Sequence, residues 1–199
     1  MTGPRKKRII IIFKQSNPHH LVLGKLKDFL TGSVLADTLD ERYRQKIAKN
    51  LVIDGKFEKT DIESNITLEV IAGLKKAAIK IDFLINFQGK AIALIKFAPG
   101  SLVTRRLSTL ALSRIIKPYQ VPIVVITNGE DAEILEGDSG KVISTGFENL
   151  PDKKNVKKNM TSFSFKLINN VMFDQASRIA YACEIDGACP CDSDVCIIE

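Results

Sequence analysis

The sequence predicts an α/β domain in which helices flank a mixed β-sheet, followed by a C-terminal helix and a cysteine-rich tail. Three patterns favour this fold class. Apolar residues recur every four positions over residues 39–51, as on one side of a helix. They alternate with polar residues over 61–70 and 79–87, as in half-buried strands. Residues 91–98 are almost continuously apolar, which is typical of a central strand.

The composition is that of an ordinary globular protein: 199 residues, of which 45% are apolar and 26% charged. No apolar run approaches the roughly 18 residues that span a bilayer. The short run 9–13, after the basic cluster 5–8, lacks the features of a signal peptide. We therefore expect a cytoplasmic protein without a membrane partner. The net charge of +6 comes almost entirely from residues 1–35.

The chain divides into three regions: a basic N-terminal extension at 1–35, the α/β domain at 36–150, and a linker, helix and cysteine-rich tail at 151–199. In the extension we expect a short helix over 21–30, closed by a turn at 31–33.

The α/β domain is expected to open with a helix. Thr38 and Glu41 form a capping-box pattern, in which both side chains can satisfy the free amides of the first turn. The apolar stripe then predicts a helix that ends between Asn50 and Gly55.

Three strands are expected after this helix, over residues 61–70, 79–87 and 91–98. Acidic side chains lie on the polar faces of the first two: Glu63, Glu69 and Asp82. A turn at 88–90 joins the last two strands, and Lys96 is the only charged residue inside the third.

The second half of the domain reads as a helix over 102–117 followed by more strands. The residues expected to face inward are Leu107, Leu110, Ala111 and Ile115. The side chains expected to face solvent are Arg105, Arg106 and Arg114. A buried strand is predicted over 121–127, and shorter strands near 134–135 and 142–143. This order of elements indicates a mixed sheet.

The order and spacing of four segments, 40–45, 81–84, 89–100 and 122–129, resemble the PD-(D/E)XK restriction-endonuclease-like fold. The resemblance is closest to the N-terminal domain of the type I restriction enzyme R subunit and covers about residues 36–150. In such nucleases an Asp on the second strand and a Glu on the third hold a divalent cation that activates water against a phosphodiester. A Lys two positions after the Glu stabilises the developing charge.

The chain departs from this catalytic pattern. Asp82 matches the metal-binding Asp, but Lys96 stands where the Glu is expected and Ala98 where the Lys is expected. A shifted alignment with a one-residue gap puts Ile95 and Phe97 at these two positions instead. The resemblance therefore implies a nuclease fold that lacks half of its motif, with a role for Mg²⁺ only if the site is active.

Asp82 and Lys96 lie symmetrically about Gly89, so a tight hairpin would place them opposite each other. The ammonium group would then neutralise Asp82 and occupy the space of the cation, which needs several oxygen ligands. Two alternatives stay open. In one, Lys96 extends to solvent from the strand end and Asp82 is hydrated. In the other, the site is rebuilt around a relocated lysine with carboxylates from neighbouring elements: Glu41, with Glu63 or Glu69.

The C-terminal region is expected to form a helix over 161–182 after a lysine-rich linker. All four cysteines follow in a C-x5-C-x-C-x4-C arrangement: Cys183, Cys189, Cys191 and Cys196. Four thiolates can form a complete ligand set for Zn²⁺ or an iron-sulfur centre. Free thiols in a mobile tail and disulfides remain alternatives, because the spacing departs from paired C-x2-C knuckles.

These features favour a catalytically degenerate nuclease-fold module that binds DNA weakly or holds a protein partner of a restriction-like or repair-like system. Phosphate contacts are expected from Arg105, Arg106 and Arg114, together with the basic cluster 5–8. An active Mg-dependent DNA endonuclease with a rearranged site is one alternative. A metal-cluster accessory protein, which uses the fold as a scaffold for its cysteines, is another.

Overall fold

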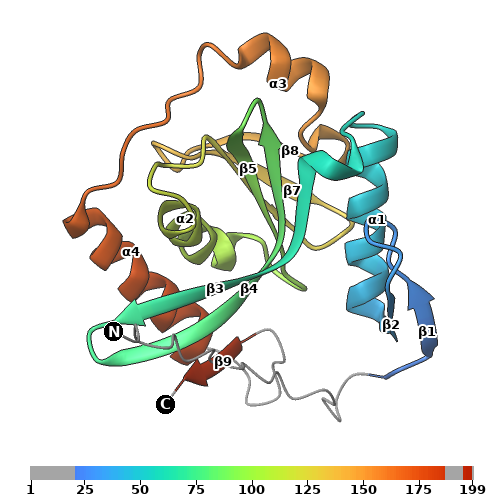
Figure 1. The fold of residues 1–199 in the computed structure, drawn as a ribbon, viewed down its shortest axis with the longest axis horizontal. Coiled ribbons are helices and arrows are strands. Elements are labelled where there is room, and N and C mark those ends of the chain that lie inside the picture. The colour runs from blue at the N-terminus through green and yellow to red at the C-terminus, as the bar shows by residue number, and fades with distance from the viewer. Residues whose placement is uncertain (1–20, 187–194, 199) are drawn as a thin grey trace, which may run out of the picture.

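The computed structural model describes residues 21–186 and 195–198 of the chain. Its centre is a mixed seven-stranded sheet, which confirms the predicted fold class (Figure 1). Six strands lie across the sheet in chain order: β3 (Ile62–Ala72), β4 (Lys75–Phe87), β5 (Lys90–Phe97), β6 (Ile123–Thr127), β7 (Ala132–Glu136) and β8 (Val142–Thr145). Among these neighbours β5 and β6 run parallel and the others antiparallel. A strand that the sequence did not predict, β9 (Val195–Ile198), pairs with β4.

Helices cover both faces of the sheet (Figure 1). Four α-helices lie in the described part of the chain: α1 (Leu39–Ile53), α2 (Arg106–Ile115), α3 (Lys153–Asn159) and α4 (Asn170–Tyr181). α1 packs on one face through Ile47, Ala48 and Leu51. α2 and α4 pack against each other and on the opposite face, through residues such as Leu112 and Ala180. None of the described helices is long and apolar enough to cross a membrane.

Local sequence signals determine the start of α1 and the turn between β4 and β5. Thr38 Oγ1 accepts a hydrogen bond from Glu41 N at 3.1 Å, which confirms the predicted N-cap. In the two-residue turn at 88–89, Gln88 and Gly89 both have positive φ, at 50° and 76°. Because this turn geometry matches the twist of antiparallel strands, it joins β4 to β5 in a tight hairpin, as predicted.

β4 changes the face to which its side chains point at Asp82. Ile81 lies in the core cluster under α2 and α4, whereas Phe83 lies in the cluster under α1. Residues two apart share a face in a regular strand, so β4 must bend between them. On the neighbouring strand β3, Asn65 has a φ of 52° at the register position opposite Asp82. The prediction that the alternating residues of 79–87 share one face is therefore wrong, because different helices cover the two halves of the strand.

Residues 21–30 do not form the predicted helix. Instead, β1 (Gly24–Lys27) pairs with β2 (Val34–Asp37) in a separate two-stranded hairpin on the outer side of α1 (Figure 1). Asp28 Oδ1 accepts hydrogen bonds from two backbone amides of the following turn, at 2.9 and 2.7 Å. Such local side-chain bonds stabilise a turn in competition with a helix.

The helices of the second half also differ from their predictions. Leu107 was expected to be buried in α2 but is 57% exposed, because the buried side of the helix is centred on Ser108 and Leu112 instead. The helix also begins later than predicted, at Arg106, after a 3-10 turn. Residues 161–169 are not helical, since their backbone forms a bridge with the segment after α2, where Ile168 N donates to Pro118 O at 3.0 Å. The predicted lysine-rich linker contains the short helix α3.

Candidate functional site

Asp82 and Lys96 face each other across the β4–β5 hairpin. The ladder pairs Phe83 with Ile95, which places Asp82 and Lys96 at the next register position. Asp82 Oδ2 lies 3.8 Å from Lys96 Nζ, and both residues are buried. The predicted juxtaposition is thus confirmed, and the alternative in which Lys96 extends to solvent is wrong. The Lys96 ammonium also donates a hydrogen bond to Lys80 O at 2.8 Å.

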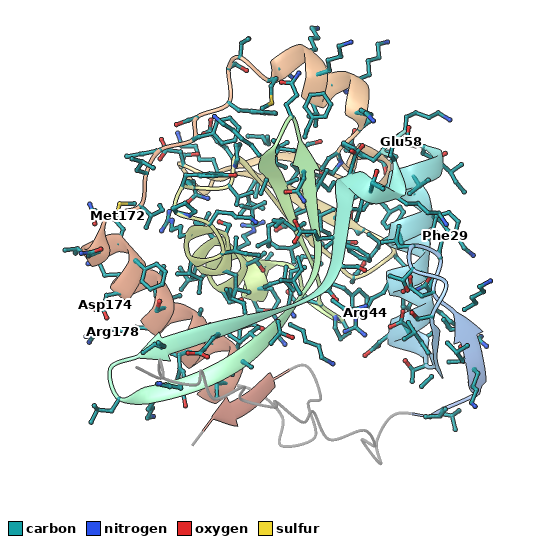
Figure 2. All side chains as sticks on the ribbon, in the orientation of Figure 1. Phe29, Arg44, Glu58, Met172, Asp174 and Arg178 are labelled. Carbon is teal, nitrogen blue, oxygen red and sulfur yellow. The ribbon has the colours of Figure 1, made fainter. Side chains whose placement is uncertain are left out.

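Asp82 has two further partners that occupy both of its oxygens. Arg44 Nε donates to Oδ1 at 2.7 Å, and Phe97 N donates to Oδ2 at 2.8 Å. Figure 2 shows Arg44 on the side of α1 that faces the β3–β4 ribbon. Two cationic side chains therefore surround one buried carboxylate, and Arg44 is the nearer of the two.

Glu41 extends this cluster along α1. The Glu41 side chain is 14% exposed, and its carboxylate lies 3.9 Å from Arg44 Nη1 and accepts a hydrogen bond from Gln45 Nε2 at 2.7 Å. Burial raises the pKa of Glu41 above its ordinary value, and these contacts offset only part of that effect. The same Gln45 amide donates to Asp28 Oδ2 at 3.1 Å. We call these five residues, Asp28, Glu41, Arg44, Gln45 and Asp82, the α1 polar cluster.

The pKa of Asp28 is shifted in the opposite direction from that of Glu41. Burial raises the pKa of Asp28, but the hydrogen bonds from Thr31 N, Gln45 and Leu30 N together outweigh burial and lower it below its ordinary value. Through its hydrogen bond with Gln45, the Asp28 carboxylate links the turn of the β1–β2 hairpin to α1.

The structure does not bring Glu63 or Glu69 to this cluster. Glu63 is exposed and accepts a hydrogen bond from Asn86 at 2.6 Å. Glu69 is also exposed and pairs in register with Ala78, four residues from Asp82 and thus roughly 13 Å away along β4. Of the carboxylates considered for a rebuilt site, only Glu41 lies near Asp82.

The residues at Asp82 do not fit a divalent cation. Such an ion needs several oxygen ligands, and both oxygens of this carboxylate already accept hydrogen bonds beside an ammonium group. Ile95 and Phe97, which the shifted alignment puts at the catalytic positions, are buried in the core cluster under α1. Within the described residues, no group of three or more His, Cys, Asp or Glu side chains could hold a metal ion.

The cysteines of the tail are only partly described. Cys183, in the π-helical turn Ala182–Asp186 that follows α4, forms no disulfide with any residue that the structure describes. Cys196 lies on β9, in register with Ala78 of β4. Cys189 and Cys191 lie outside the described residues, so a zinc or iron-sulfur site at the four cysteines stays a prediction of the sequence.

The three arginines predicted to bind nucleic acid lie in α2 and in the 3-10 turn just before it. Arg106 makes a bidentate ion pair with Glu133 through two bonds of 2.6 Å, and Arg114 Nε donates to Gln120 Oε1 at 3.1 Å. Arg105 lies in the 3-10 turn Val103–Arg105 that precedes α2, and Arg114 lies in the last turn of the helix. Two of the three guanidinium groups thus have acceptors within the protein.

Arg44, Gln45 and Asp28 were missed by the sequence reasoning, although a signal for Arg44 was present. Arg44 precedes Ile47, Ala48 and Leu51 by three, four and seven positions, so it lies on the buried stripe of α1. A charged residue on such a stripe needs a buried partner. Asp82, the only acidic residue inside 79–87, was the natural candidate.

Comparison with known proteins assigns the domain. No curated protein and no solved structure matches the chain. The family model of the type I restriction enzyme R protein N terminus matches residues 39–151, which is more than half of the chain. The match spans α1 and the strands β3 to β8, and thus includes Arg44, Asp82 and Lys96. The chain therefore belongs to the family of type I restriction enzyme R protein N-terminal domains.

Proposed function

We propose that this chain is a non-cleaving nuclease-fold module that holds DNA or a partner protein in a restriction-type system. The observation that carries the proposal is the environment of Asp82. Its Oδ1 accepts a hydrogen bond from Arg44 and its Oδ2 accepts one from the Phe97 amide. The Lys96 ammonium lies 3.8 Å from Oδ2. The family supports a restriction-system context, because its named member is the R protein of a type I restriction enzyme.

Phosphodiester hydrolysis in a fold of this kind depends on a cation held by carboxylates, which activates water and stabilises the leaving oxygen. In this chain the two cationic side chains supply the charge that the metal would supply. They cannot ionise a water molecule as a metal does, since an ammonium or guanidinium group has no open coordination position. Ile95 and Phe97 add neither a ligand nor a general base, so binding without cleavage is the chemistry that these residues support.

The test is a nuclease assay with Mg²⁺ and Mn²⁺ on the full chain, alongside calorimetric titration with Mn²⁺. We expect no cleavage and no Mn²⁺ binding. The variant Lys96→Glu should gain Mn²⁺ binding, because a second carboxylate then replaces the ammonium beside Asp82. Lys96→Gln is the matched control, which removes the charge without adding a carboxylate, and it should gain none. Cleavage by the wild-type chain that disappears in Asp82→Ala would overturn the proposal.

A further inference from the structure

Three lysines from separate elements meet at a groove beside α1. The groove has a volume of about 470 Å³ and lies between α1 and the turn at 28–32, which closes the β1–β2 hairpin. Its basic residues are Lys27 at the end of β1, Lys49 on α1 and Lys59 in the 3-10 turn Lys59–Asp61. All three lysines are exposed.

The positive charge of this groove is not neutralised within the described residues. Asp28 is the only acidic residue in its lining, and its oxygens already accept hydrogen bonds from two amides of the turn and from Gln45. Lys27 and Lys49 have no acidic partner in the described part of the chain. Lys59 donates to the Phe29 carbonyl and lies 4.1 Å from the centre of the Phe29 ring, neither of which removes its charge.

A second groove of about 360 Å³ continues the basic surface around α1. Lys49 lines both grooves, and Lys46 and Arg42 join it in the second one, which also has one acidic residue in its lining, Asp54. Arg42 is paired with Asp37, so the unpaired charges of this groove come from the two lysines. The three basic residues are exposed and spaced by four and three positions, so they form one stripe along the outer side of the helix. Lys46 donates to a carbonyl, Gly129 O, at 2.7 Å and lies over the Phe147 ring, and it has no carboxylate partner among the described residues.

We infer that this surface, defined by Lys27, Lys46, Lys49 and Lys59, binds the phosphate backbone of duplex DNA. The inference rests on the proposed function, which supplies the restriction-system context. We call these four residues the α1 lysine surface. It lies on the opposite side of the sheet from α2, whose arginines the sequence had favoured.

The lining of the first groove favours phosphates over an acidic protein. Protein interfaces are built around an apolar core, whereas nonspecific DNA binding is dominated by ion pairs with phosphates. The apolar side chains of this groove, Phe29 and Leu30, are half-buried and pack on the core under α1. Figure 2 labels Phe29 at the outer edge of α1, next to the hairpin. The charged groups that this groove offers to a partner are therefore the three ammonium groups.

The test is the salt dependence of binding between the full chain and a short fluorescent DNA duplex, measured by anisotropy. In the variant Lys27→Gln/Lys49→Gln/Lys59→Gln, the slope of log K against log salt should fall by about 0.9 for each lysine. The matched control, Lys154→Gln/Lys157→Gln/Lys158→Gln, makes the same charge change on α3 and should keep the wild-type slope.

Three outcomes would overturn this inference: no DNA binding by the wild-type chain at low salt, equal slopes for the wild type and the groove variant, or an equal loss in the α3 control. Preferential binding of polyglutamate over the duplex would also overturn it, and would indicate an acidic protein partner. None of these results bears on cleavage. Cleavage of the duplex with Mg²⁺ would instead overturn the proposed function, but it would not contradict DNA binding at the α1 lysine surface.

Discussion

At the residue scale, Asp82 is a buried carboxylate held by cationic side chains from two other elements. A buried carboxylate is costly unless hydrogen bonds and opposite charges compensate for the lost hydration. Arg44, Lys96 and the Phe97 amide provide that compensation. The Arg44 guanidinium also lies 5.2 Å from the centre of the Phe97 ring, so the side chain that neutralises Asp82 packs on the residue at the shifted lysine position.

The first residue-scale prediction concerns Arg44. Arg44→Ala should lower the free energy of unfolding by about 3 kcal/mol, because Asp82 would lose its nearest charge partner while it stays buried. Adding Asp82→Asn should recover much of this loss, since the unpaired charge is then absent. Urea denaturation of the single and double variants measures both effects.

Arg42→Ala is the control for this prediction. Arg42 also pairs with an aspartate, Asp37, but its side chain is 54% exposed, so its loss should destabilise the protein much less than the loss of Arg44. If Arg44→Ala were no more destabilising than Arg42→Ala, Arg44 would not be the main counter-ion of Asp82.

At the element scale, the bend shared by β3 and β4 determines where Asp82 lies. The first half of β4 pairs with β9 and packs under α4, and the second half pairs with β5 under α1. Asn65 at φ 52° absorbs the bend on β3, in a backbone region that Asn tolerates better than other non-glycine residues. The alternating pattern predicted both strands but not this change of face, because the change depends on helices far away in the sequence.

The element-scale prediction tests the conformation of Asn65. Asn65→Val should destabilise the protein by about 1 to 2 kcal/mol, because a β-branched residue strongly disfavours positive φ. Asn65→Gly should be nearly neutral. Both changes are at an exposed position, so they alter little packing. Thr67→Val, two residues further along β3 and also exposed, is the control for β-branched substitution and should have no such cost. Thermal unfolding of the three variants distinguishes backbone strain from side-chain effects.

At the scale of the whole molecule, sequence patterns predicted those helices, strands and turns that depend on neighbouring residues. The helix capped by Thr38, the strands β3 to β8 and the hairpin about Gly89 all follow from periodicity and turn residues. The hairpin brings Asp82 opposite Lys96 only together with a one-residue register shift between Ile85 and Asn86, which the sequence did not predict. The β1–β2 hairpin and β9 were missed because short strands carry little periodic signal and depend on tertiary pairing. The basic groove was missed because it depends on tertiary structure. Lys27, Lys49 and Lys59 are far apart in the sequence and come together only where the hairpin packs on α1.

The two carboxylates of the α1 polar cluster with shifted pKa values, Glu41 and Asp28, make the stability of the fold depend on pH. Glu41 has a raised pKa in the folded state, so above its unfolded value of about 4.5 folding must work against its ionisation. Its contribution therefore becomes unfavourable as the pH rises through the folded pKa. Asp28 has a lowered pKa, so it stabilises the fold above its unfolded value of about 3.8, and this stabilisation is lost as the pH falls through the folded pKa.

The last prediction follows from these opposite signs. Glu41→Gln should match the wild type in acid and become the more stable protein as the pH rises to about 7, because the amide keeps the Gln45 contact without a charge to bury. Asp28→Asn should be destabilised by about 2 kcal/mol near neutral pH, since a charged acceptor is lost, and should approach the wild type in acid. Melting temperatures of the three proteins from about pH 3 to about pH 7 measure both differences. Parallel curves for all three would contradict the prediction, because they would show that neither carboxylate changes its pKa on folding.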